Sequence, residues 1–121
     1  MATIANVITE IAWFRENAHS VLWETLTTTN DTGGALDAAG ATIKSVQVTG
    51  TFGAGGTVVI QGSNDGTNYV TLNDNQDNPL SLTSAGIESI QENTRYVRPF
   101  VSAGDGTTDL DVTMVVVRRG N

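Results

Sequence analysis

Apolar and polar residues alternate along most of this chain, and a period of two residues predicts β-strands. A strand from about Ile43 to Phe52 shows the pattern most clearly, because its two faces differ in character: Val46, Val48 and Phe52 on one, and Ser45, Gln47, Thr49 and Thr51 on the other. A similar pattern starts at Ser20, with Val21, Trp23 and Thr25 on one face and Leu22, Glu24 and Leu26 on the other. Each such strand is expected to press one face on a core and leave the other in water.

The middle of the chain predicts a glycine turn followed by a hairpin. Gly53, Gly55 and Gly56 can take the positive φ values that a chain reversal requires, and residues 57–60 form a β-branched run suited to a strand. Asn64-Asp65-Gly66 comes next, and Asp-Gly between two apolar runs is a strong hairpin signal. The sheet is expected to resume after this turn with Tyr69, Val70 and Leu72.

Shorter strand patterns fill the rest of the chain, whereas residues 35–42 are small and are expected to be irregular. Apolar pairs after the polar loop at residues 73–79 suggest brief strands, around Leu80 and Leu82 and around Ile87 and Ile90. In the strand predicted from Arg95 to Val101, Pro99 has no amide donor and implies an edge, a bulge or a gap in the pairing. The last predicted strand, residues 109–119, has one apolar face made of Leu110, Val112, Met114 and Val116.

About eight short strands joined by turns predict an antiparallel sandwich or barrel in a single domain, residues 20–121. Residues 1–19 differ, because their apolar residues recur at spacings of three and four and predict a short helix or arm: Ile4, Val7, Ile8, Ile11 and Phe14. Val7, Ile11 and Trp13 also allow an extended conformation. Such a segment could pack over one end of its own sandwich or dock on a neighbouring subunit.

Four short motifs carry a resemblance to known proteins. Residues 62–69, Gly-Ser-Asn-Asp-Gly-Thr-Asn-Tyr, resemble a hairpin of discoidin-like (galactose-binding-like) β-sandwiches. Together with Gly-Thr-Phe-Gly at residues 50–53, Arg-Tyr-Val-Arg-Pro at 95–99 and Gly-Asp-Gly-Thr-Thr-Asp at 104–109, they are similar to head decoration, or cement, proteins of tailed phages. The resemblance extends over residues 20–119 and implies a jelly-roll-like sandwich.

Composition narrows the classes of function. Six basic and thirteen acidic residues among 121 give a net charge of −7, which opposes nucleic-acid binding because that affinity comes largely from Lys and Arg. The absence of cysteine excludes disulfides and thiolate chemistry. Glu10, Arg15 and Glu16 interrupt the only early apolar stretch, so we expect neither a signal peptide nor a membrane span, and a soluble, unprocessed chain.

The sequence predicts no catalytic residue and no cofactor. The single histidine, His19, has no recognised nucleophile motif near it. Carboxylates gather in or beside turns and could hold calcium, although Asp and Asn are also the ordinary residues of turns: Asp65, Asp74, Asp77, Asp105, Asp109 and Asp111. The run from Asp74 departs from the helix-loop-helix calcium pattern, because Pro79 stands where that loop needs glycine. Turn chemistry is the simpler explanation.

Several residues are candidates for contacts with partners. Arg95 and Arg98 could reach carboxylates on a neighbouring subunit or on their own domain. The N-terminal apolar cluster is the expected contact with a capsid or a sister subunit, because exposed apolar surface of that size marks an interface: Ile4, Val7, Ile8, Ile11, Trp13 and Phe14. A glycan site has less support, because Tyr69 and Tyr96 lie inside strand patterns and Trp13 alone is expected to be exposed.

The function that the resemblance implies is that of a non-enzymatic virion protein, made in the host cytoplasm, that binds the outer surface of a phage capsid and stabilises it. Its partners would be the major capsid protein and further copies of itself, with a trimer favoured over a dimer by similarity to other jelly-roll cement proteins. A carbohydrate-binding module of a tail or fibre apparatus is the alternative. A hydrolase with distributed carboxylates is a third possibility that no feature of the sequence favours.

Overall fold

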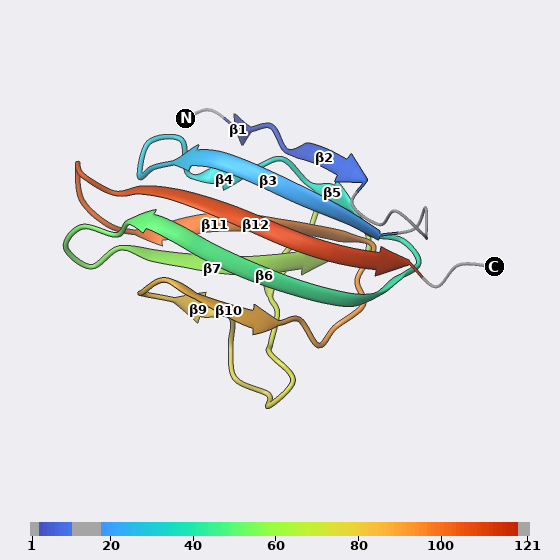
Figure 1. Ribbon diagram of the computed structural model, residues 1–121. Helices are drawn as coiled ribbons and strands as arrows, with labels where there is room; N and C mark the ends of the chain where they lie inside the picture. The colour runs from blue at the N-terminus through green and yellow to red at the C-terminus, as the bar shows by residue number, and fades with distance from the viewer. Residues whose placement is uncertain (1–2, 11–17, 119–121) are drawn as a thin grey trace.

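The computed structural model describes residues 3–10 and 18–118, the side chain of Glu10 excepted, and shows two packed β-sheets. No helix occurs in these residues, which confirms the predicted all-β sandwich (Figure 1). The strands of the described chain are β1 (Thr3–Ile4), β2 (Val7–Glu10), β3 (Ala18–Leu26), β4 (Thr32–Gly33), β5 (Leu36–Asp37), β6 (Ala41–Thr51), β7 (Thr57–Ser63), β8 (Val70–Thr71), β9 (Ser81–Leu82), β10 (Gly86–Ser89), β11 (Tyr96–Ala103) and β12 (Asp109–Arg118).

The chain crosses repeatedly between the two sheets. The five-stranded sheet has the order β10-β6-β12-β3-β2, and it lies in front in Figure 1. The seven-stranded sheet behind it has the order β1-β4-β11-β7-β8, with β5 also paired to β11 and β9 to β7. All pairs are antiparallel except β1 with β4. The glycine turn after β6 therefore leads from one sheet to the other, and the predicted hairpin is the β7–β8 pair.

Strand β12 lies at the centre of the five-stranded sheet and supplies the middle of the core. Met114 pairs with Val21 of β3 and with Val46 of β6, and all three side chains are fully buried. The alternating residues predicted to face inward on β12 are all buried: Leu110, Val112, Met114 and Val116. Apolar residues from the seven-stranded sheet close the core from the other side: Leu36, Val58, Ile60, Val97 and Val101.

The predicted faces of β3 are wrong at its end. The pattern places Leu26 on one face with Leu22 and Glu24, but its side chain is fully buried, as are those of Val21 and Trp23 on the predicted opposite face. Thr25 has a φ of 61°, and the β3–β12 register shifts between Leu110 and Val112, so an irregularity at this point returns Leu26 to the core face. The Asp111 carboxylate accepts a hydrogen bond from the Thr25 amide at 3.0 Å and holds the irregularity in place.

Pro99 lies in the gap in pairing that its missing amide donor predicts. On one side of β11 the pairing with β7 is continuous through Pro99. On the other side, Val97 pairs with Leu36 of β5 and Phe100 pairs with Thr32 of β4, so no strand pairs with Pro99 itself. The interruption between β4 and β5 therefore removes the need for a donor at this position.

Of the conformations that the sequence allows for the N-terminal segment, the described residues take the extended one, and no helix forms in them. Val7–Glu10 forms β2, which pairs antiparallel with β3, and Thr3–Ile4 forms β1, which pairs with β4. The apolar residues at spacings of three and four belong to two short strands in different sheets. Ile4 of β1 packs against the core, whereas Val7 of β2 faces outward. Residues 3–10 thus add one strand to each sheet.

Candidate functional site

One end of the sandwich contains a cleft of about 220 Å³ between the two sheets. Strands β2, β3 and β12 of the five-stranded sheet form one wall, and β5 of the seven-stranded sheet forms the other. The described residues that line it are Ile8, His19, Val21, Leu36, Asp37, Val116 and Arg118.

The strand register explains why the cleft has an apolar floor and a polar rim. His19 pairs with Val116 across β3 and β12, and Ile8 pairs with Val21 across β2 and β3. Val21, Val116 and Leu36 belong to the buried core, so the inner part of the cleft is apolar. The polar residues of the lining are His19, Asp37 and Arg118.

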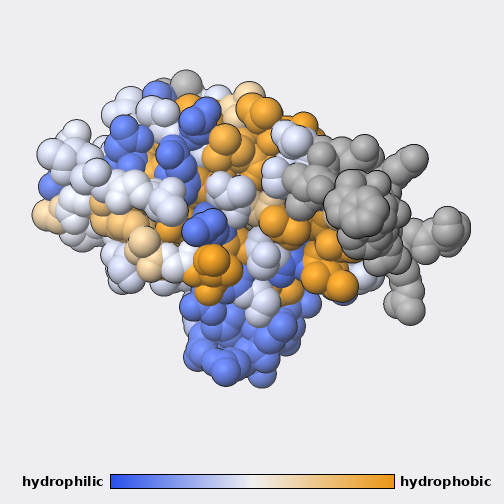
Figure 2. All heavy atoms as spheres, in the orientation of Figure 1, coloured by the Kyte–Doolittle hydropathy of each residue, from blue (hydrophilic) through white to orange (hydrophobic). Residues whose placement is uncertain are grey.

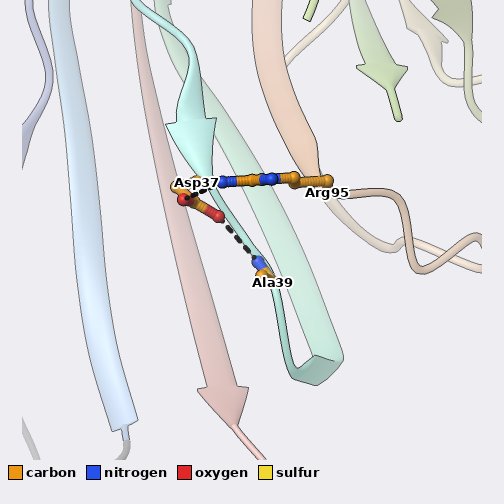
Figure 3. Close-up of polar contacts among 3 residues, drawn as sticks. All are labelled: Asp37, Ala39 and Arg95. Carbon is orange, nitrogen blue, oxygen red and sulfur yellow. Dashed lines mark hydrogen bonds and ion pairs between the residues drawn. The ribbon is translucent and has the colours of Figure 1, made fainter. Parts of the chain in front are cut away.

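Asp37 connects this cleft to Arg95, one of the two arginines singled out in the sequence. Its carboxylate accepts a hydrogen bond from the Ala39 amide at 3.1 Å and lies 3.5 Å from the Arg95 guanidinium (Figure 3). Both side chains are about half exposed, so solvent screens the ion pair and its contribution to stability is small. Only Asp37 of this pair lines the cleft, and the Arg95 guanidinium keeps further donors beside it.

Two of the predicted contact residues lie next to each other on strand β2. Val7 and Ile8 are 57% and 53% exposed, and Ile8 lines the cleft whereas Val7 faces the opposite side of the sheet. β2 is the last strand of its sheet, so the described structure pairs it on one side only. Ile4 differs, since it is partly buried against the core. Ile11, Trp13 and Phe14 lie outside the described residues.

Arg98 lies on the seven-stranded sheet and does not reach the cleft. Its Nε donates a hydrogen bond to Gln61 Oε1 at 2.9 Å, and its guanidinium stacks 3.7 Å from the centre of the Tyr69 ring. Tyr96 follows Arg95 in the chain and is half-buried. The Arg95 guanidinium lies 5.1 Å from the centre of the Tyr96 ring. The structure therefore gives both arginines partners within the domain.

The turn carboxylates act within their own loops. Asp65 accepts hydrogen bonds from the amides of Asn68 and Thr67, both at 2.8 Å, and these hold its pKa well below its usual range. The amides of Asn78 and Gln76 likewise lower the pKa of Asp74. The described residues contain no group of three or more His, Cys, Asp or Glu side chains placed to hold a metal ion.

Asp105 ties two turns together at the opposite end of the sandwich from β5. It accepts hydrogen bonds from the hydroxyl of Thr107 at 2.7 Å and from the amide of Ala54 at 2.9 Å, and these lower its pKa to about 2. The second bond fixes the crossing turn after β6, in which Gly53 has a φ of 71°. A Cβ at Gly53 would lie 2.3 Å from the Asp105 carboxylate, so this close approach requires glycine.

A buried lysine forms a separate polar cluster that the alternation pattern did not reveal. Lys44, the chain's only lysine, faces the core side of β6 with 2% of its surface exposed, and its Nζ donates to Asn93 Oδ1 at 2.7 Å. Burial lowers its pKa, and the nearby charge of Glu92 partly offsets this effect. Glu92 accepts two hydrogen bonds from Asn73, so the cluster joins β6 to the loops on either side of β9 and β10.

The described lining of the cleft combines apolar residues with three polar side chains. His19 and Asp37 both line it, but a triad would also need a hydroxyl or thiol nucleophile, and the described lining contains no Ser, Thr or Cys. An apolar floor with His, Asp and Arg at the rim suits an apolar side chain accompanied by polar groups. No helix in the described part of the chain is long and apolar enough to cross a membrane.

Sequence reasoning missed the two residues of β5. Leu36 and Asp37 lie in a stretch expected to be irregular, where small residues hide a two-residue strand. One signal was available, because an isolated Leu in a stretch of Gly and Ala requires a buried place, and Leu36 is 6% exposed. The sequence did draw attention to Ile8, Arg95 and His19, and the structure brings them to one end of the sandwich.

Comparison with known proteins identifies a shared fold. No protein-family model matches this chain, and no curated protein sequence matches it. Among solved structures, the SPBc2 prophage-derived protein YomS is similar with a TM-score of 0.59 at 11% identity, over 83% of this chain and 94% of that one. Protein NMB1881 from Neisseria meningitidis has a TM-score of 0.45 at 9% identity, over 92% of this chain and 83% of that one. The chain thus has the same fold as a prophage-derived protein.

Proposed function

We propose that this chain is a structural virion protein that binds the outer surface of a phage capsid and stabilises it. The observation that carries the proposal is the open apolar cleft beside the exposed strand β2, at the end of a fold shared with a prophage-derived protein. The resemblance to cement proteins of tailed phages supports the same function. Its partner is the major capsid protein, and its location is the outside of the virion.

The chemistry of the cleft suits the task of a cement protein. Such a protein stabilises a particle by burying surface across the junctions between capsid subunits, with apolar contact at the centre and a polar rim. Ile8 and the floor of the cleft supply the apolar contact, and the Asp37–Arg95 pair supplies groups for the rim. Repetition of this contact by the symmetry of the capsid makes a modest single interface effective over the whole particle.

The contact is tested by placing a charge at the mouth of the cleft. Ile8→Asp should weaken binding to capsids stripped of this protein at least tenfold, because a carboxylate would be desolvated in an apolar contact. Val70→Asp is the matched control, since Val70 is 64% exposed on β8 of the other sheet and adds the same charge. Co-sedimentation over a range of protein concentrations gives both affinities.

Two results would overturn the assignment of the cleft. If both variants bind like the parent chain, the capsid contact lies elsewhere on the molecule. If both lose binding equally, the added negative charge itself opposes attachment, and the cleft has no special role. A glycan-binding function would instead show as affinity for an oligosaccharide on a glycan array, with no binding to capsids.

A further inference from the structure

The outer face of the five-stranded sheet carries three adjacent rows of uncharged side chains that cross the strands. The first row runs over all five strands, with the residues Val7, Leu22, Thr113, Gln47 and Ile87. The second row does the same with Thr9, Ser20, Val115, Ser45 and Ser89. The third row covers the three middle strands with Ala18, which is buried, and with Val117 and Ile43. We call these three rows the neutral face.

None of the residues in the neutral face carries a charge, although the chain as a whole has a net charge of −7. The acidic residues nearest to it along β3 and β12 are Glu24 and Asp111, which lie one row beyond it, and Asp111 is engaged with the Thr25 amide. Figure 2 views this side of the molecule, and apolar residues appear across it while the most hydrophilic surface gathers on the loop that projects below.

Large apolar side chains project from this face into solvent. Ile43 is 65% exposed, Ile87 is 62% exposed and Val7 is 57% exposed, and they come from three different strands. No described layer of the chain covers them, because both sheets are already packed against each other through their inner faces. An uncovered apolar sheet face of this extent marks an interaction surface.

We propose that the neutral face packs against the same face of a second copy of this chain. Charge selects this occupant, because two chains of −7 repel each other wherever their carboxylates meet. Among the described residues, the neutral face places no charged side chain of one copy opposite a charged side chain of the other. Thr, Ser and Gln side chains between the apolar residues can satisfy one another across the contact.

The size of the face agrees with a reversible pair. Five strands spaced about 4.8 Å apart, crossed by three rows about 7 Å apart, give a patch of roughly 25 Å by 20 Å. Two such patches bury on the order of 1,000–1,200 Å² in total, which is at the lower limit of specific interfaces. Association in the micromolar range is therefore expected.

Both copies use the same face in this contact, so the contact is isologous and its symmetry is two-fold. The assembly expected in solution is accordingly a pair, in place of the trimer that the resemblance to cement proteins favours. The inference takes from the proposed function only the expectation that the chain forms a homo-oligomer. It is tested with purified protein and no capsids, so its failure and the failure of capsid binding are distinguishable.

Sedimentation velocity from about 1 to about 200 µM protein tests the pair. Gln47→Lys and Ser45→Lys each place a positive charge within the neutral face, where the two-fold axis brings it near its own copy. Thr71→Lys is the control, on an exposed position of β8 in the other sheet. Each variant reduces the net negative charge by one, so any loss of association cannot come from stronger overall repulsion.

The parent chain and Thr71→Lys should shift together from one copy to two as concentration rises. Both neutral-face variants should need at least tenfold more protein for the same shift, while unfolding cooperatively like the parent chain. The proposal is overturned by a parent chain that stays single up to about 200 µM, or by an association that the neutral-face variants leave unchanged. A limiting mass of three copies would also overturn it. Two neutral-face variants are used so that misfolding of one leaves the test intact.

Discussion

Among single residues, Thr25 has an unfavourable backbone conformation that a substitution can relieve. Its φ of 61° costs a β-branched residue about 1–2 kcal/mol. Thr25→Gly removes this cost and adds about 0.5–1 kcal/mol of chain entropy to be lost on folding. The expected result is a free energy of unfolding higher by about 0.5–1 kcal/mol, measured by urea denaturation.

Thr49→Gly serves as the control for this change. Thr49 lies in the regular part of β6, opposite Asp111, where glycine should lower the free energy of unfolding by about 1 kcal/mol. Opposite signs for the two substitutions would show that the irregularity in β3 is strained. Equal destabilisation would contradict this account of how Leu26 reaches the core.

Asp105 makes stability depend on pH in the acid range. Its pKa is about 2 in the folded protein against an ordinary value of 3.8, because Thr107 and Ala54 donate hydrogen bonds to the ionised carboxylate. The carboxylate therefore stabilises the fold above about pH 4, and this contribution is lost as the pH falls from about 4 to about 2. Asp65 and Asp74, whose pKa values are also lowered, act in the same direction.

Asp105→Asn should be less stable than the parent chain at neutral pH, and the difference should shrink as the pH approaches 2. Urea denaturation at several pH values gives both curves. Thr107→Val removes one donor and should move the parent's acid loss of stability to higher pH. A difference between Asp105→Asn and the parent that is constant across the acid range would contradict the linkage.

At the scale of elements, β1 and β2 connect the N-terminal segment to both sheets. Deleting residues 1–10 removes the half-buried Ile4 and the pairing of β2 with β3, and also leaves the Gly34 amide without its bond to the Ile4 carbonyl at 2.6 Å. We expect a loss of roughly 2 kcal/mol in the free energy of unfolding, with cooperative unfolding retained. The rest of the core comes from other strands and should persist.

Thermal unfolding followed by circular dichroism measures this effect. Ile4→Ala is measured beside the deletion, because it removes one part of the same contacts. The substitution should account for about half of the loss, because it removes the packing and keeps the strand pairing. A truncated chain that fails to fold would show that residues 3–10 are an essential part of the sandwich. An unchanged stability would show that their pairing contributes nothing.

The long strands could be predicted from the sequence because alternation reveals them. The apolar faces of β6 and β12 and the β7–β8 hairpin were all read from side-chain pattern and turn residues, and the structure confirms them. Of the five strands of two residues, β8 and β9 were predicted from their apolar residues, but β1, β4 and β5 could not be found, since a period of two needs at least four residues to be visible. They exist because β7, β11 and their neighbours offer free edges for short segments to pair with.

The sequence also could not assign strands to sheets. The turn between β6 and β7 has the glycines of a hairpin, yet it leads from one sheet to the other because β6 pairs with β10 and β12 instead. For the same reason the cleft was not predictable as a unit. Ile8, His19 and Asp37 meet only once β2, β3 and β5 are placed in their sheets.

At the scale of the whole molecule, two separate surfaces carry the two proposed contacts. The cleft and strand β2 lie at one end, where polar groups surround an apolar floor. The neutral face lies on one broad side of the molecule, and none of its residues carries a charge. A protein that attaches to a capsid at its end and to a second copy through its side could link neighbouring positions on the particle surface.

The central claim, attachment to a capsid with stabilisation, is tested most directly by co-sedimenting the purified protein with matched capsids stripped of it and heating the same particles. The account predicts saturable binding at micromolar protein and a higher disruption temperature of the particles, because the bound protein adds buried surface across subunit junctions. Particles that bind nothing at micromolar protein, or that bind it and break at an unchanged temperature, would contradict the claim.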